Sequence, residues 1–489
     1  MTTARWSSGF GFLLATVGAA VGLGNIWRFS AVVGQNGGGA YLVPYLIAAV
    51  VCAVPMLVLE LAIGRRLRTD VVSAFRSVNT AYTALGWLIL GGVLLILSYY
   101  LVLTGWVLGF FLSWLAGSPT TFAPFTASWL PVGFFVVATA VTGGVVSMGV
   151  RGGIERMATV VMPTVFALLV ALALYAVTLS EWDHAAAFLF TPEFSVLTDL
   201  GIWSAAFGQV FFSMSVGQGI MLTYGSYVEE GTDLLRSSVV IAIADIGAAI
   251  VAGLVIFPIV FSFGLQPTLG TELAFTTLPT AFATMPFGRV IAVAFFGLLF
   301  FAALSSSVAL LEVGVAAAEN TTRLSRRRAT LLLTGGVFVA GVPSALSYSP
   351  VSLAVAGRPV LDLVDESVGT FALPISALCL VFVFVWVADA EPVHEELGRL
   401  YPFVRYLIPA VLVVVTAART VGIARPAWRL VVVTAARTVG IARPAWRLVV
   451  GHARDGPLGL LVAVALLLVF AVLGWVLRRR LPAVRGRRR

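Results

Sequence analysis

The sequence predicts an all-α integral membrane protein with about twelve transmembrane helices. The chain has 489 residues, of which 60% are hydrophobic and only 11% are charged, and its mean hydropathy is +1.02. Soluble proteins carry about a quarter of their residues as charge. The composition therefore excludes a water-soluble enzyme and also a disordered or fibrous chain.

Apolar runs of about 20 residues, the length that a membrane-spanning helix needs, follow one another along the chain. Because irregular backbone is not stable in lipid, each run is interpreted as one helical crossing. The expected spans are residues 9–33, 38–63, 84–116, 131–149, 154–180, 201–227, 237–264, 287–318, 329–347, 360–388, 402–420 and 458–478.

The arginines are distributed asymmetrically between the two sets of loops. Loops 117–130 and 182–200 contain none, whereas the loop after the second span carries four. The protein is expected in the plasma membrane. Because cytoplasmic loops are enriched in basic residues, both termini are expected in the cytoplasm. The net charge of +9 is explained by these loops and by anionic lipid, and no nucleic-acid partner is expected.

The spans divide into two sets of five and a C-terminal pair. We expect a first repeat at 1–180, a second and inverted repeat at 201–388, and two further helices with a basic tail at 402–489. The segment VVVTAARTVGIARPAWRL stands at 413–430 and again, without change, at 431–448. One copy is expected to end the eleventh span, and the other to form a loop or a surface helix.

Two spans carry glycines and polar side chains in mid-run, which predicts breaks in the helix. The first reads GFLLATVGAAVGLGNIWRFS and the sixth reads GQVFFSMSVGQGIMLTYGSY. Glycine is unfavourable inside a helix, although small residues also let membrane helices pack closely. Asn25, Ser213, Ser215 and Gln218 lie at the same depth, and such groups are costly in hydrocarbon unless they face a site. Broken helices that begin both halves favour a transporter with a site at the membrane midplane.

Six ordered motifs resemble those of the neurotransmitter:sodium symporter family, in particular its bacterial amino-acid transporters. They are GAAVGLGNIWRF at 18–29, NGGGAYLVPY at 36–45, YYLVLTGWVLGF at 99–110, GQVFFSMSVGQG at 208–219, FFAALSSSVALLE at 300–312 and DESVGT at 365–370. The resemblance runs from about Arg5 to the last span. It implies a fold of five plus five inverted helices with breaks in helices one and six, followed by two more helices.

The resemblance implies two sodium sites and no chloride. The first would comprise the Ala20 carbonyl, Asn25, Ser213, Asp245 and the substrate carboxylate. The second would use the carbonyls of Gly18, Val21 and Ala302 with the hydroxyls of Ser305 and Ser306. Chloride-dependent relatives have a neutral residue where this chain has Asp245, so a fixed carboxylate would replace the anion. Two alternatives remain: the serines could bond their own helix, and Asp245 could have a structural role only.

Substrate contacts and gates are carried over from the same resemblance. The amino-acid substrate would be bound by Ala20, Gly22, Leu23, Gly24, Ile96, Tyr100, Phe212, Ser213, Ser215, Gln218, Ser306 and Leu310. Gln218 could bond a polar substrate group or nearby backbone. The outer gate would comprise Arg28, Asp365, Gln209, Tyr100 and Phe212, and the inner gate Arg5, Trp6, Ser226 and Tyr227. At the inner gate Asn320 stands where the family has an acid, with Glu319 beside it.

These observations predict a sodium-coupled symporter that imports an amino acid by alternating access. One alternative is a proton-coupled carrier of the same fold, in which Asp245 or Glu312 would titrate. Another is a sensor that binds an amino acid without transporting it. No catalytic constellation for a membrane enzyme is recognisable. The oligomeric state is not predicted.

Overall fold

The computed structural model describes residues 4–192, 194–265, 273–322, 324–388 and 391–423. Residues up to Arg405 form one compact unit, and Tyr406 begins a second. In the described residues, eight helices are long and apolar enough to cross a membrane, and a bent pair makes a ninth. The fold is thus the all-α membrane architecture that the composition predicts.

The first five crossings follow the predicted spans closely. They are α1 Gly9–Ala20 with α2 Phe29–Gln35, α3 Gly39–Ala48 with α4 Val54–Leu67, α6 Thr83–Ala116, α8 Leu130–Ser147 and α9 Arg156–Ala176. Ser8 starts α1 by accepting a hydrogen bond from the Gly11 N–H, and Gly117, with φ of 75°, ends α6. Both are common devices for satisfying the free backbone groups at helix ends.

The next five predicted spans also correspond to helices or helix pairs, of which four are among the nine candidate crossings and the first, a pair of shorter helices, is not. They are α11 Leu200–Ser213 with α12 Ile220–Gly225, α13 Leu234–Ser262, α15 Gly288–Thr322, α16 Arg326–Ser347, and α17 Val360–Val364 with α18 Phe371–Val381. The eleventh span is represented by α20 Ile408–Ile423, so the first copy of the duplicated segment begins inside a helix. The second copy, 431–448, and the twelfth span lie outside the described residues. The repeat boundaries 1–180, 201–388 and 402–489 stay a prediction.

Short elements that hydropathy did not predict connect the crossings. The helices are α5 Val71–Val78, α7 Phe122–Thr126, α10 Trp182–Phe190, α14 Leu278–Thr284 and α19 Glu391–Leu397, and a two-stranded hairpin pairs β1 Ala354–Val355 with β2 Arg358–Pro359. One-turn π-helices occur at Gly24–Arg28, Ala49–Ala53, Val150–Glu155, Leu273–Thr277, Asp365–Thr370, Phe382–Val387 and Phe403–Leu407. Such turns bend membrane helices without leaving backbone groups unbonded.

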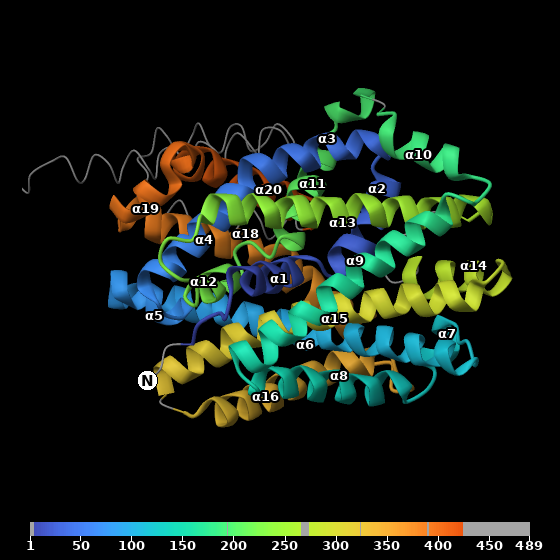
Figure 1. Ribbon diagram of the computed structural model, residues 1–489, viewed down its shortest axis with the longest axis horizontal. Helices are drawn as coiled ribbons and strands as arrows, with labels where there is room; N and C mark the ends of the chain where they lie inside the picture. The colour runs from blue at the N-terminus through green and yellow to red at the C-terminus, as the bar shows by residue number, and fades with distance from the viewer. Residues whose placement is uncertain (1–3, 193, 266–272, 323, 389–390, 424–489) are drawn as a thin grey trace, which may run out of the picture. The chain divides into compact units, whose positions relative to one another are not determined.

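Within the first unit, the two longest helices, α6 and α15, pack along one another. α6 packs on α15 and α8, and α16 packs on α6 and α8, so these four helices form one group, seen at the bottom of Figure 1. Helices α4, α12 and α13 form a second group, in which α12 and α13 each pack against α4. Helix α1 contacts α9, α13, α15 and α12, and therefore lies between the two groups.

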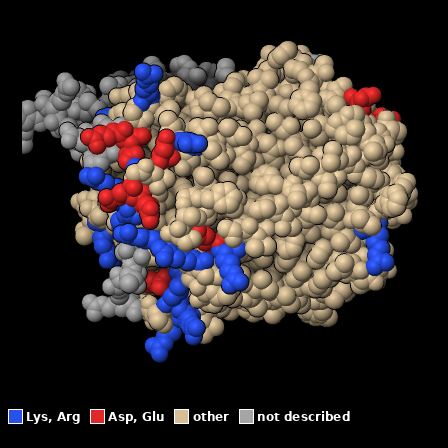
Figure 2. Space-filling model, viewed as in Figure 1, with Lys and Arg blue, Asp and Glu red and all other residues tan. Residues whose placement is uncertain are grey.

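Arginines gather at one end of the visible face, whereas most of that face is uncharged (Figure 2). This end carries the N-terminus and α5 (Figure 1). The exposed arginines of the predicted cytoplasmic loops include Arg66, Arg76, Arg151 and Arg327. A band of apolar surface beside a basic end is the distribution expected for a membrane protein with that end in the cytoplasm.

Candidate functional site

Both predicted helix breaks are present, and they lie next to each other. Helix α1 ends at Ala20, Val21 adopts ψ of 103°, and the helix resumes at Gly24 with a bend of 51°. Helix α11 ends at Ser213 and α12 begins at Ile220. Between them Ser215 has φ of 54° and Gly217 has φ of 81°. The positive φ angles turn backbone amides and carbonyls away from helical partners and toward a shared site.

A buried glutamate in α4 holds the second break. Glu60 is 0% exposed, and its Oε1 accepts a hydrogen bond of 2.6 Å from the Gly217 N–H. Its Oε2 has no hydrogen-bond partner in the described residues. A buried carboxylate needs such donors to offset its desolvation. The sequence prediction missed this residue, although an acid inside the apolar run VPMLVLELAIG is itself a signal of function.

The predicted first sodium site is a connected polar cluster around Asp245, which is 0% exposed in α13. The Ser213 hydroxyl donates to Asp245 Oδ1 and lies 2.9 Å from both carboxylate oxygens. Asn25 Nδ2 donates to Asp245 Oδ1 over 2.6 Å and to the Ser213 oxygen over 2.8 Å. Tyr45, which the prediction did not include, donates from its hydroxyl to Oδ2 over 3.4 Å. Asp245 and Ser213 thus present oxygens to one point, as a hard monovalent cation requires. Asn25 turns its amide nitrogen toward them, and its Oδ1 accepts a hydrogen bond from the Gly22 N–H, so coordination of a cation by Asn25 requires the opposite orientation of this amide.

Four of the five groups predicted for the second sodium site are joined by hydrogen bonds. The Ser305 hydroxyl donates to the Gly18 carbonyl over 2.7 Å and to the Ala302 carbonyl over 2.9 Å. The Ser306 hydroxyl reaches the same two carbonyls at 3.4 and 3.3 Å. Val21 is the residue at which α1 stops. The serines bond across to the broken helix as well as to their own helix, and the sodium site itself stays a prediction.

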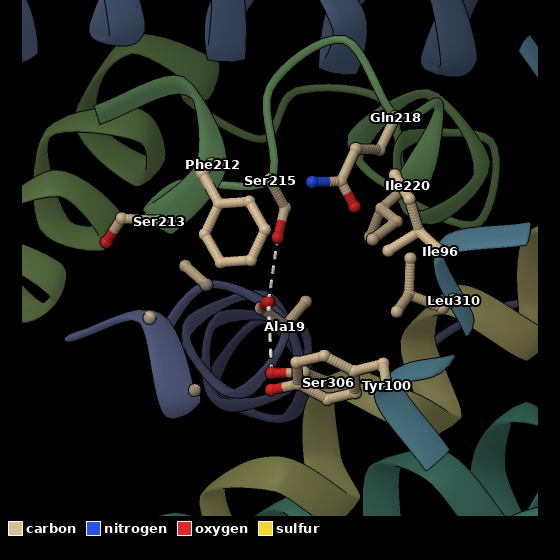
Figure 3. Close-up of a pocket in the computed structure, with 13 residues that line it drawn as sticks. Ala19, Ile96, Tyr100, Phe212, Ser213, Ser215, Gln218, Ile220, Ser306 and Leu310 are labelled. Atoms are coloured by element: carbon tan, nitrogen blue, oxygen red, sulfur yellow. Dashed lines mark hydrogen bonds between the residues drawn. The ribbon is translucent and has the colours of Figure 1, made fainter. Parts of the chain in front are cut away.

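The predicted substrate residues enclose a cavity of about 30 Å³ between the two breaks. Eleven of the twelve line it, and Ala19 and Ile220 line it in addition. Figure 3 shows Ser215 and Ser306 meeting at the Ala19 carbonyl, which accepts hydrogen bonds of 2.9 and 3.5 Å from their hydroxyls. A cavity of this size holds about two water molecules, so an amino acid requires the lining side chains to move apart.

Leu23, the twelfth residue, contributes its backbone rather than a side chain in the cavity wall. Its N–H donates to the Tyr100 hydroxyl over 3.2 Å. These are the two groups predicted to bind a carboxylate, and one carboxylate oxygen can reach both. Gly22 is required here, because a Cβ would lie 2.6 Å from Ser306 Oγ and 2.9 Å from the Tyr100 oxygen.

The outer gate residues surround Phe212 without a direct ion pair. The Arg28 guanidinium carbon lies 4.2 Å from the Phe212 ring centre, a cation–π contact. Gln209 Nε2 donates to the Gly24 carbonyl over 2.8 Å. Arg28 and Asp365 are both described and half-buried, and no ion pair joins them. Arg28 therefore contacts the aromatic ring of Phe212 rather than the carboxylate of Asp365.

The inner gate residues form a closed contact at the arginine-rich end. Trp6 is 3% exposed, its indole N–H donates to the Tyr224 carbonyl over 3.1 Å, and its backbone N–H donates to the Tyr227 carbonyl over 3.3 Å. The Trp6 and Tyr227 rings lie 6.0 Å apart. Arg5 and Ser226 line a separate cavity of about 930 Å³ beneath them. The site is thus closed toward this end.

Charged groups that the prediction did not pair complete the inner closure. Glu312, 0% exposed in α15, accepts from the Tyr227 hydroxyl over 2.8 Å and from Arg326 over 2.5 Å. Glu319 also contacts Arg326, at 3.2 Å, rather than Arg5. Asn320 donates to Asp70 over 3.0 Å. A buried carboxylate is stable only with such partners, and breaking this network would release Tyr227.

Comparisons with known proteins agree with this architecture. The sequence profile described as the sodium:neurotransmitter symporter family matches residues 3–129 and 132–474. An "Uncharacterized sodium-dependent transporter" of Haemophilus influenzae is 31% identical over 84% of this chain and 96% of its own. The "Uncharacterized sodium-dependent transporter YhdH" of Bacillus subtilis is 33% identical with the same coverages.

The descriptions of two further relatives name a small molecule. The crystal structure of MhsT in complex with L-phenylalanine superposes with a TM-score of 0.78 at 36% identity, covering 84% of this chain and 98% of that one. The "Sodium- and chloride-dependent GABA transporter 2" of Bos taurus is 26% identical over 83% of this chain and 75% of its own. The three relatives from Haemophilus influenzae, Bacillus subtilis and Bos taurus are named as transporters, as the sequence predicts for this chain.

Proposed function

The chain belongs to the sodium:neurotransmitter symporter family, and on that premise we propose that it imports an amino acid together with sodium, by alternating access. The observation that carries this proposal is the Asp245 cluster beside a cavity lined by backbone groups. The N–H of Leu23 and the Tyr100 hydroxyl suit a carboxylate, and the Ala20 and Phe212 carbonyls suit an ammonium group. This combination is common to α-amino acids.

Coupling follows from residues that serve both sites. Ala20 and Ser213 line the substrate cavity, and both belong to the proposed first sodium site. Asn25 accepts a hydrogen bond of 3.0 Å from the Gly22 N–H in the same cavity wall. A substrate carboxylate placed here would enter the sodium shell. Each ligand would then raise the affinity for the other by the same factor, as thermodynamic linkage requires.

Charge balance supports transport without chloride. Asp245 places a carboxyl group next to the proposed cation, and no charged side chain is among the described residues that line the substrate cavity. A sodium ion, the carboxylate of Asp245 and a zwitterionic substrate then need no further anion to offset charge in this buried place. The second sodium, at Ser305 and Ser306, would be bound by neutral oxygens alone.

The structure is interpreted as a state closed toward the cytoplasm. Trp6 and Tyr227 are buried beneath the cavity, whereas Arg28 and Asp365 do not pair directly. Transport would require the outer groups to close over the substrate and the Tyr227–Glu312–Arg326 contacts to open. The arginine-rich end would face the cytoplasm, with both termini there and the protein in the plasma membrane.

Uptake into proteoliposomes tests the proposal. The purified protein is reconstituted with sodium outside and potassium inside, and labelled neutral amino acids are offered. We expect accumulation that disappears when sodium is replaced by choline and persists when chloride is replaced by gluconate. Accumulation driven by a pH gradient without sodium would instead favour the proton-coupled carrier. Binding without accumulation would favour the sensor.

A further inference from the structure

One polar side chain in the substrate cavity has no partner. Gln218 lies between the two halves of the sixth span and is 4% exposed. Its amide points into the cavity beside Ser215 and Ile220 (Figure 3). Among the described residues the Gln218 side chain makes no hydrogen bond, whereas the neighbouring Ser215 hydroxyl is bonded to the Ala19 carbonyl. Of the two roles expected for Gln218, a hydrogen bond to nearby backbone is therefore not present among the described residues.

The surroundings of this amide are apolar. Ile96, Ile220 and Leu310 lie around it in the cavity wall (Figure 3). None of these three side chains can donate or accept a hydrogen bond, and the neighbouring Ser215 hydroxyl donates to the Ala19 carbonyl instead. The amide of Gln218 is therefore free to bond a group that enters the cavity. A buried amide left without a partner is unfavourable. An apolar substrate side chain would displace water from the amide and leave it unsatisfied.

We propose that Gln218 selects the substrate side chain, so that the protein prefers neutral amino acids with an uncharged hydrogen-bonding group over apolar ones of the same shape. The inference rests on the proposed amino-acid transport. A carboxamide fits best, because two amides can each donate and accept, and a hydroxyl can make one of these bonds. A charged side chain is disfavoured, since no lining side chain would neutralise it.

The magnitude of the preference follows from the unsatisfied amide. Sites built to hydrogen-bond a substrate group discriminate strongly against analogues that lack it. Loss of one such bond in a buried site changes binding by about 10-fold or more. Pairs of equal shape separate this effect from size: threonine and valine, asparagine and leucine, glutamine and methionine.

Competition measurements on the full-length protein test the inference. Labelled substrate is bound to the purified protein in sodium, and each member of the three pairs is titrated as a competitor. The same titrations are made with Gln218→Met, which keeps the length of the side chain, and with Gln218→Leu as a second apolar variant should the first fold poorly. Thermal stability of each variant confirms that it is folded.

We expect the apolar member of at least one pair to need about 10 times the concentration of its polar partner, or more, to compete. This apolar-to-polar ratio should fall to one or below in Gln218→Met. Equal competition by all pairs in the wild type, or a ratio unchanged in both variants, would overturn the inference. In either case sodium-dependent binding of some amino acid would leave the proposed function intact. Failure to bind any amino acid in sodium would instead refute the proposed function.

Discussion

Glu60 offers the most specific test of the broken sixth helix. Its carboxylate accepts the Gly217 N–H at 2.6 Å in a fully buried position, and Gly217 holds φ of 81°. Glu60→Met removes the acceptor and leaves that N–H unsatisfied, which costs about 1–3 kcal/mol. Because the break forms the cavity wall, we expect substrate affinity to fall by about 5- to 150-fold. Glu60→Gln keeps an acceptor of the same shape without the charge and should lose less.

The assay is equilibrium binding of a labelled amino acid to purified protein in saturating sodium. Thermal unfolding of each variant, followed in the same detergent, identifies variants that fail to fold. The predicted order of affinity is wild type, then Glu60→Gln, then Glu60→Met. If Glu60→Met is folded and binds substrate as tightly as the wild type, then Glu60 does not support the geometry of the break, and the reasoning is wrong.

Three further predictions concern sodium, the inner gate and chloride. Ser305→Ala removes a hydroxyl from the proposed second sodium site and should raise the sodium concentration for half-maximal binding about 10-fold. Ser307→Ala, whose hydroxyl bonds the Ala303 carbonyl, should leave that concentration unchanged, and equal effects of the two variants would contradict the proposed site. Tyr227→Phe removes a hydrogen bond to Glu312 worth about 1 kcal/mol. A thiol reagent should therefore modify a cysteine introduced by Ser226→Cys about 5-fold faster in the Tyr227→Phe variant than in the wild type. An unchanged rate of modification would argue against Tyr227 as a gate. Asp245→Asn should make uptake depend on chloride, and uptake insensitive to gluconate replacement would contradict the charge argument.

The crossings could be predicted from sequence because lipid imposes length and hydropathy on each of them. The predicted span 84–116 is α6, Thr83–Ala116, and the predicted span 360–388 matches the helical stretch Val360–Val387. The connecting elements could not be predicted in this way. Helix α5 and the hairpin of β1 and β2 are not among the candidate crossings, so the length and hydropathy that a crossing requires do not constrain them.

The cavity was predicted largely through the family resemblance, since its residues lie in ordered motifs. Ala19 and Ile220 were missed because their position depends on the path of the backbone through the breaks, which no local pattern specifies. Glu60 and Tyr45 were missed although both are polar groups in apolar spans. The partners of Glu312 could not be found from sequence, because the Tyr227–Glu312–Arg326 network joins three elements whose packing sets their distances.

A sodium ion bound at Asp245 would make amino-acid binding sodium-dependent. The most direct measurement is a sodium titration of labelled amino-acid binding to the purified wild type and to Asp245→Ala, with thermal stability as the check on folding. The account predicts saturable, sodium-dependent binding by the wild type and its loss in a folded Asp245→Ala protein. The same sodium dependence in both proteins would contradict it.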